Sequence, residues 1–116
     1  MSSPKEAKAR MMSEGDLLKC VLDLAKVFGW KTAHFRPART QHGWRTPVAG
    51  DGKGFVDLVL VRPGRYLFIE LKSEKGKLSA EQENWLGWLR AAVGSDSVRV
   101  LRPSDWLNGE VEKLLT

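Results

Sequence analysis

The stretch Gly54–Lys72, GFVDLVLVRPGRYLFIELK, determines how the rest of the chain is interpreted. Two short apolar runs flank a turn at residues 62–65, and such runs between turn signals predict buried strands. Each run contains one acidic residue, Asp57 in the first and Glu70 in the second. A buried carboxylate is costly unless something pairs with it, so the two acids need a common explanation.

Pairing Arg62 with Arg65 across a two-residue turn would place Asp57 directly opposite Glu70. Glu70 and Lys72 share a face because side chains alternate along a strand. Opposed residues on one face have Cβ atoms roughly 5 Å apart, and carboxylates that close repel unless a cation lies between them. Such an oxygen-rich site suits Mg²⁺ or Mn²⁺. The Pro-Gly turn also permits a bulge, and a one-residue slip would move Asp57 off this face.

Length and composition indicate one compact domain with a preference for polyanions. The chain has 116 residues and a net charge of +5, with a pI near 9.6. The single cysteine, Cys20, lies in an apolar helical pattern and cannot form an internal disulfide, which fits a reducing, cytoplasmic setting. No segment has the roughly 20 apolar residues needed to span a membrane, and the first residues lack the apolar run typical of a signal peptide.

The order of expected elements predicts a mixed sheet with helices on its faces. Residues 1–12 are interpreted as a flexible basic arm and residues 13–116 as a single domain. Consecutive hairpin strands followed by a helical crossover imply mixed strand directions, in the order α-β-β-β-α-β-α. The expected ranges are a helix at 13–28, strands at 30–35, 55–61 and 66–71, a helix at 79–93, a strand at 97–101 and one C-terminal helix from 103.

Basic residues gather in two segments that we expect to be irregular, 36–53 and 73–78. Guanidinium groups interleaved with Trp44 suit phosphate contacts and base stacking, although a solvated loop would have a similar composition. The candidate nucleic-acid-binding residues are Arg36, Arg39, Arg45, Lys53, Lys75 and Lys77.

Asp57 followed by Glu70-Leu71-Lys72 on the next strand resembles the PD-(D/E)xK nuclease superfamily. The chain is most similar to its stand-alone VRR-NUC branch of phage and bacterial nucleases, which implies a restriction-endonuclease-like αβββαβ core with a C-terminal helix. One departure is Val56, where the family usually has proline. The shared features are Ser13-Glu14, Gly29-Trp30, His34, Gly54-x-x-Asp57-Leu58, Phe68-x-Glu70-Leu71-Lys72, Gly76-Lys77-Leu78-Ser79, Gln82 with Trp85, and Arg102-Pro103-x-Asp105.

The resemblance implies roles for the matching positions. Asp57 and Glu70 would bind Mg²⁺ together with the Leu71 carbonyl, and Lys72 would hold the attacking water or stabilise charge on the phosphorane. A metal at such a site neutralises the phosphodiester and lowers the pKa of bound water.

Two further positions have both a catalytic and a structural interpretation. Glu14 would reach the metal from the first helix, directly or through water, but an acid in a first turn is also favoured by the helix dipole. Gln82 would orient Lys72 or the substrate phosphate, but it also stands at the capping-box position after Ser79.

The resemblance implies a metal-dependent DNA endonuclease that acts on branched DNA such as four-way junctions, as a homodimer. A phage-encoded enzyme would act in the host cytoplasm. The alternatives are a non-catalytic DNA-binding protein that keeps the fold, and a nuclease of linear or single-stranded nucleic acid; composition leaves RNA open. A sequence-specific restriction enzyme is disfavoured because few residues remain for reading bases.

Overall fold

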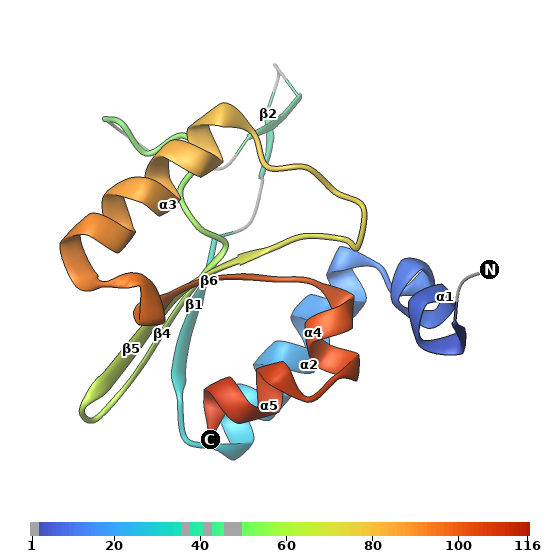
Figure 1. The fold of residues 1–116 in the computed structure, drawn as a ribbon. Coiled ribbons are helices and arrows are strands. Elements are labelled where there is room, and N and C mark those ends of the chain that lie inside the picture. The colour runs from blue at the N-terminus through green and yellow to red at the C-terminus, as the bar shows by residue number, and fades with distance from the viewer. Residues whose placement is uncertain (1–2, 36–37, 41–42, 46–49) are drawn as a thin grey trace.

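The computed structural model describes residues 3–35, 38–40, 43–45 and 50–116, with the backbone alone for 38–40 and 43–45. It shows the expected mixed α/β architecture, consistent with a restriction-endonuclease-like fold (Figure 1). The elements are α1 (Pro4–Met11), α2 (Glu14–Val27), β1 (Lys31–His34), β2 (Ala38–Thr40), β3 (Gly43–Arg45), β4 (Leu58–Arg62), β5 (Arg65–Leu71), α3 (Ala80–Val93), η1 (Ser95–Ser97), β6 (Val98–Leu101), α4 (Pro103–Leu107) and α5 (Glu110–Leu115).

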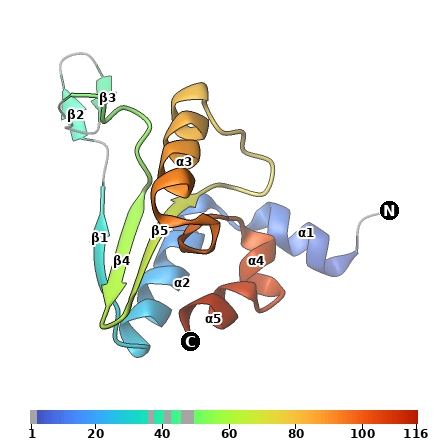
Figure 2. The same cartoon turned by 60° about the vertical axis from the view of Figure 1, so that its left-hand side comes forward.

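The central sheet has the strand order β1-β4-β5-β6. Its first two pairings are antiparallel, whereas β5 and β6 are parallel and are connected through α3. The turn pairs Arg62 with Arg65 and Leu58 with Ile69, so the predicted hairpin register is confirmed. Gly64 adopts φ 81°, which a non-glycine residue in this turn would rarely adopt. A separate hairpin, β2-β3, stands beyond the end of the main sheet (Figure 2).

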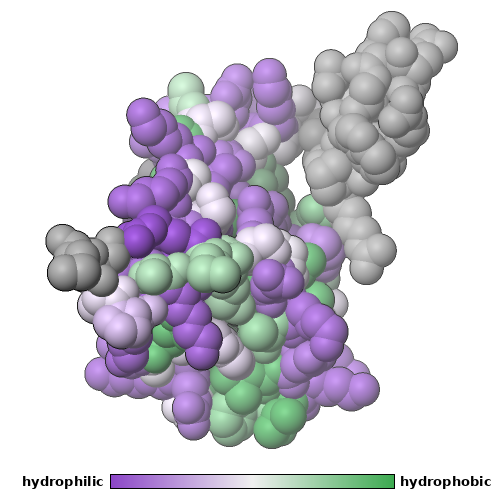
Figure 3. Space-filling view, turned by 90° about the vertical axis from the view of Figure 1, so that its right-hand side faces the viewer, coloured by the Kyte–Doolittle hydropathy of each residue, from purple (hydrophilic) through white to green (hydrophobic). Residues whose placement is uncertain are grey.

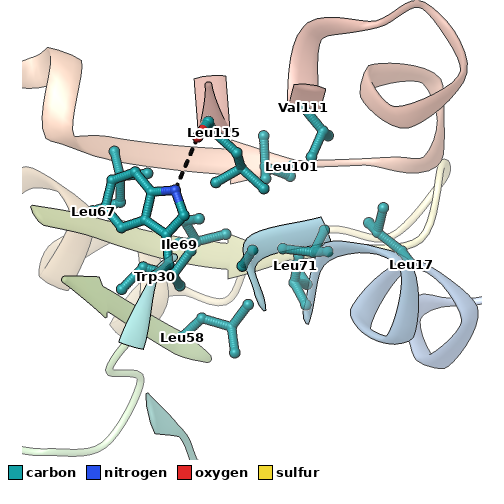
Figure 4. Close-up of a cluster of buried hydrophobic side chains, with 12 residues drawn as sticks. Leu17, Trp30, Leu58, Leu67, Ile69, Leu71, Leu101, Val111 and Leu115 are labelled. Carbon is teal, nitrogen blue, oxygen red and sulfur yellow. Dashed lines mark hydrogen bonds between the residues drawn. The ribbon is translucent and has the colours of Figure 1, made fainter. Parts of the chain in front are cut away.

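The two faces of the sheet are covered by different helices. In Figure 1, α3 lies over one face, and α2, α4 and α5 lie over the other. The larger apolar cluster fills the second face (Figure 4), and it comprises Leu17, Val21, Ala25, Trp30, Leu58, Leu60, Leu67, Ile69, Leu71, Leu101, Val111 and Leu115. Under α3, the buried cluster is Val56, Leu86 and Val98, with partly buried Val59 and Phe68 among its neighbours. The alternation of side chains along β5 therefore places Glu70 on the α3 face.

Trp30 connects the large cluster to the C-terminal end of the chain. Its indole nitrogen donates to the Leu115 carbonyl at 2.9 Å, as the dashed line in Figure 4 shows. The guanidinium groups of Arg62 and Arg65 lie 4.5 and 5.1 Å from the centre of the Trp30 ring. Arg62 also donates to the Thr116 carbonyl at 2.7 Å. Through these cation–π contacts and hydrogen bonds, the β4–β5 turn holds α5 against the sheet.

Local capping signals in the sequence correctly predicted where the two long helices begin. Ser13 and Asp16 form a reciprocal capping box at the start of α2. Ser79 and Gln82 form another at the start of α3. Each pair satisfies two backbone N–H groups that would otherwise lack partners, so the signal depends on neighbouring residues alone.

Several expected boundaries were wrong. Residues 4–11 form α1 instead of an arm without secondary structure, because Ser3 caps the helix and Ala9 is buried. The segment 36–53, expected to be irregular, contains the β2-β3 hairpin. Strand β4 begins at Leu58, three residues later than expected. The C-terminal helix is divided into α4 and α5 because Gly109 adopts a left-handed conformation with φ 84°.

Surface character differs between regions. Figure 3 shows the face that carries α1, where hydrophilic side chains predominate. Exposed large apolar residues include Met11 at the end of α1 and Trp88 on α3, which is 75% exposed. Within the ranges described above, no helix combines the length and apolarity that crossing a membrane requires.

Candidate active site

Asp57 lies at the entrance of β4, where its carboxylate reaches across to β5. The Leu71 backbone N–H donates to Asp57 Oδ2 at 2.8 Å. The Asp57 carbonyl accepts from Phe35 N–H at 3.0 Å and so extends the pairing between β1 and β4. Both the backbone and the side chain of Asp57 are therefore held by neighbouring strands, and the carboxylate is fixed beside Glu70, as the register predicted.

Glu70 is a charged side chain in a fully buried position. It is 1% exposed, and its Oε2 has no hydrogen-bond partner among the described residues. Burial, followed by the neighbouring Asp57 carboxyl, raises the pKa of Glu70 to about 9, while the charge of Lys72 opposes the rise. A buried carboxyl with an unpaired oxygen is expensive in a stable fold, and such groups concentrate at functional sites.

Gln82 has the capping role and a contact in the site at the same time. Its amide oxygen accepts from Ser79 N–H at 2.8 Å, which completes the capping box. Its amide nitrogen donates to Glu70 Oε1 at 3.0 Å. The cap therefore fixes the orientation of the amide that contacts Glu70. The capping interpretation is confirmed, and the contact of Gln82 within the site is with Glu70; a role toward Lys72 or the substrate phosphate stays a prediction.

Glu14 and Lys72 complete the charged surroundings of the two acids. Glu14 is the exposed first residue of α2, and partial desolvation together with Asp57 raises its pKa, while Lys72 lowers it. Lys72 directly follows β5, and its backbone N–H donates to the Leu101 carbonyl at 3.1 Å. The beginning of β4, the end of β5 and the beginnings of α2 and α3 therefore converge on one place.

Gly54 is a site-shaping residue whose role the sequence did not reveal. It has φ +87°, and a Cβ at this position would lie 2.6 Å from the backbone carbon of Glu81 and 2.8 Å from Gln82 N. The segment leading to Asp57 thus lies directly on the first turn of α3. Only glycine permits this approach, because any larger residue would push Gln82 away from Glu70.

The donor atoms at the site fit a hard divalent cation. Asp57 and Glu70 offer carboxylate oxygens, the ligand type that Mg²⁺ and Mn²⁺ prefer, and Glu70 Oε2 lacks a protein partner in the described part of the chain. Over the same residues, no group of three or more His, Cys, Asp or Glu side chains is close enough to form a metal cluster. The structure thus brings together two of the three expected acidic ligands, with Glu14 in electrostatic reach but outside a compact cluster.

His34 was noted in the sequence but has no role in this arrangement. It ends β1 opposite Leu58, and its Nδ1 is buried without a hydrogen-bond partner among the described residues. Nothing else in the described part of the chain explains why this nitrogen lacks a partner.

The expected basic residues differ in how far the structure describes them and in what they contact. Arg36 lies outside the described residues, and Arg39 and Arg45 lie in β2 and β3, where only the backbone is described. Lys53 pairs with Glu81 at 3.4 Å on the surface. Lys77 is exposed. Lys75 lines a groove of about 420 Å³ between α1 and α4, together with Lys5, Arg10 and other residues.

The family follows from a comparison with known domains. The model of the VRR-NUC domain matches residues 9–101. The chain belongs to the VRR-NUC domain family. VRR-NUC domains are PD-(D/E)xK nuclease domains, so the protein has a nuclease domain, and the match includes Glu14, Asp57, Glu70, Lys72 and Gln82. A search of curated proteins gave no significant match.

Proposed function

We propose that this VRR-NUC protein is a Mg²⁺- or Mn²⁺-dependent DNA endonuclease that acts on branched DNA such as four-way junctions. The observation that carries the proposal is the pair of neighbouring acids, Asp57 and Glu70, of which Glu70 is buried with one oxygen that has no partner among the described residues. A fold accepts such a costly arrangement where a cation completes it.

Each residue of the site has a separate task. Asp57 and Glu70 would hold the divalent ion together with the Leu71 carbonyl, and Glu14 would reach it directly or through a water molecule. When bound, the ion supplies charge neutralisation and an acidified water. Lys72 holds that water or stabilises negative charge on the phosphorane, as preorganised cations do in transition states. Gln82 keeps the Glu70 carboxylate in place through its 3.0 Å hydrogen bond.

Contacts to the DNA backbone come from the basic residues around the site. A net charge of +5 favours a polyanion, and phosphate contacts by Lys and Arg make binding salt-dependent. The groove beside Lys75 is lined by the basic Lys5 and Arg10 and also by the acidic Glu6 and Glu74. The proposed contact residues are Arg36, Arg39, Arg45, Lys53, Lys75 and Lys77.

A homodimer is the proposed working unit. One domain of this size has one such site, so cutting both strands of a junction requires two copies. Exposed aromatic side chains such as Trp88 and Tyr66 offer apolar area for an interface. Light scattering at micromolar concentration tests this, and a monomeric mass would contradict it. The proposed location is the cytoplasm, of a phage-infected host if the gene belongs to a phage.

Cleavage of defined DNA structures tests the activity. Labelled four-way junction, splayed-arm and linear duplex DNA are incubated with the protein and Mg²⁺, Mn²⁺ or EDTA, beside Asp57→Asn and Lys72→Ala. The expected result is junction-selective nicking that EDTA and both substitutions abolish. Equal cutting of all substrates would keep the chemistry and overturn the branched-DNA preference. Metal-independent binding without cleavage would indicate a non-catalytic DNA-binding protein instead.

A further inference from the structure

The Arg102-Pro103-x-Asp105 motif has no task in the reaction described above, yet it is tied to the loop that follows Lys72. Arg102 Nη1 donates to the carbonyl oxygens of Ser73 and Gly76 at 2.7 Å each, and it lies 3.4 Å from that of Glu74. Arg102 is half-buried, and one of its guanidinium nitrogens thus lies within hydrogen-bonding distance of three carbonyl oxygens of a single loop. A positive donor suits this place because several carbonyl dipoles point toward it.

A side chain of the loop also accepts a hydrogen bond from the start of α4. Glu74 Oε2 accepts from Ser104 N–H at 3.0 Å, in the first turn of α4. Arg102 N–H donates to Asp105 Oδ2 at 2.8 Å, which fixes the backbone that carries the guanidinium. Residues 72–76 are therefore held along residues 101–104 from both sides, beginning with the bond from Lys72 N–H to the Leu101 carbonyl.

Gly76 connects this clamp to the side chain of Lys72. A Cβ added to Gly76 would lie 2.8 Å from Ser73 Oγ and 3.5 Å from Lys72 Cδ. The loop consequently closes tightly on itself and packs against the aliphatic stem of the lysine. Arg102 donates to the Gly76 carbonyl, so a shift of the guanidinium would also move Gly76, which lies against the stem of Lys72.

We propose that Arg102 is a positioning residue of the nuclease site, which fixes loop 73–76 and thereby holds the Lys72 ammonium beside Glu70. This inference rests on the proposed function. The flexible stem of a lysine loses conformational entropy when it is held in one place, and the clamp removes that freedom before substrate binds. Arg102 lies immediately after the segment matched by the VRR-NUC domain, which ends at residue 101.

Hydrogen exchange and cleavage kinetics together test the clamp. The variants are Arg102→Ala and Arg102→Lys, and the control is Arg99→Ala on β6, whose guanidinium makes a local bond to the Asp96 carbonyl. We expect Arg102→Ala to speed amide exchange in the peptide 73–78 by about tenfold or more, with α2 and β4 unchanged. We expect kcat on cleaved DNA to fall by about 10²-fold with KM changed less than threefold, since misplacement of a reacting group acts on the chemical step. Arg102→Lys retains the positive charge but not the planar, forked guanidinium donor. We expect its loop exchange rate and its kcat to lie between those of the wild type and of Arg102→Ala.

Chemical rescue distinguishes positioning from a general loss of structure. Millimolar guanidinium added to Arg102→Ala should restore both the slow exchange of loop 73–78 and part of kcat, and it should leave Arg99→Ala unaffected. Should Arg102→Ala fail to fold, Glu74→Gln weakens the clamp from the other side and should raise exchange in the same peptide.

The outcomes separate this inference from the proposed function. Unchanged loop exchange in the Arg102 and Glu74 variants would overturn the clamp. Faster loop exchange with unchanged kcat would overturn the positioning role. A wild-type protein that cleaves nothing would contradict the proposed function, and the exchange measurements would then still decide whether the clamp exists.

Discussion

The two faces of the central sheet differ in what they bury. The face covered by α2, α4 and α5 has a closed apolar cluster of twelve buried residues within the described chain. The face under α3 has a smaller cluster centred on Val56, Leu86 and Val98, and at its end it buries Glu70. One face is therefore built for stability, whereas the other gives up apolar burial to hold a carboxylate.

Adjacent residues of β5 make the difference concrete. Ile69 is 0% exposed and faces the large cluster, while Glu70 is 1% exposed and faces α3. Equal burial has opposite consequences, because removing apolar area from water stabilises the fold and removing a carboxyl from water costs free energy. Strained or costly groups persist at functional sites because the rest of the fold supports them. The large cluster provides that support here.

The largest expected effect is on cleavage and comes from the α3 face. Asp57→Asn retains the shape and one acceptor oxygen but removes the charge that would hold the divalent ion. We expect kcat to fall by about 10³-fold, equivalent to about 4 kcal/mol of transition-state stabilisation. Thermal unfolding of the metal-free variant should change little, because the amide keeps an oxygen that can accept from Leu71 N–H. An unchanged cleavage rate would exclude Asp57 from the reaction.

The sequence predicted the hairpin register and the helix starts around this site correctly because their signals are local. The turn Arg62-Pro63-Gly64-Arg65 determined the hairpin register, and alternation along β5 then put Glu70 and Lys72 on one face. Ser13 and Ser79 marked the starts of α2 and α3 through caps that involve residues only three positions away. The hydrogen bond from Gln82 to Glu70 was beyond such reasoning, since it depends on how α3 packs on the sheet.

A second comparison uses neighbouring residues of β4 that face opposite sides. Leu60 is fully buried in the large cluster, and Val59 is partly buried under α3. We expect Leu60→Ala to lower the free energy of unfolding by about 3 kcal/mol and Val59→Ala by about 1 kcal/mol, since the lost contacts and the cavity differ in size. Urea titration of both variants measures this. Equal losses would mean that the two faces contribute alike.

Features that depend on packing partners were missed or misplaced. Helix α1 was not predicted because its apolar content is small and its burial depends on α4, although Ser3-Pro4 is a start signal of the expected kind. Gly109 was read as part of one C-terminal helix, but the chain turns there through φ 84° so that α5 can pack beneath the sheet. The close approach of Gly54 to α3 could not be predicted, because the sequence shows only that position 54 is a glycine.

The close packing of Gly54 against the first turn of α3 can be tested by substitution. Gly54→Ala would bring a Cβ within 2.6 Å of Glu81 at a backbone φ of +87°. We expect a loss of about 2 kcal/mol in the free energy of unfolding, together with slower cleavage, because Gln82 moves away from Glu70. The matched control is Gly87→Ala in the middle of α3, where a Cβ meets nothing within 4 Å. The free energy of unfolding of Gly87→Ala should rise by about 0.5 kcal/mol because alanine has the higher helix propensity, and its cleavage rate should be normal. If both variants lost stability, the contact between Gly54 and α3 would not be the cause.

The smallest effect per step is the pH dependence of stability that Glu70 on the α3 face contributes. The folded-state pKa of Glu70, about 9, exceeds the ordinary value of 4.5, so between about pH 5 and 8 the folded protein keeps a proton that the unfolded chain has released. Stability without metal should therefore fall as pH rises, by at most about 1.4 kcal/mol for each pH unit. Urea titrations in EDTA at several pH values measure the slope, and Glu70→Gln should flatten it because the amide does not titrate. The same slope in Glu70→Gln would assign the proton to another group, and the contrast between the two faces of the sheet would then not rest on the burial of this carboxyl.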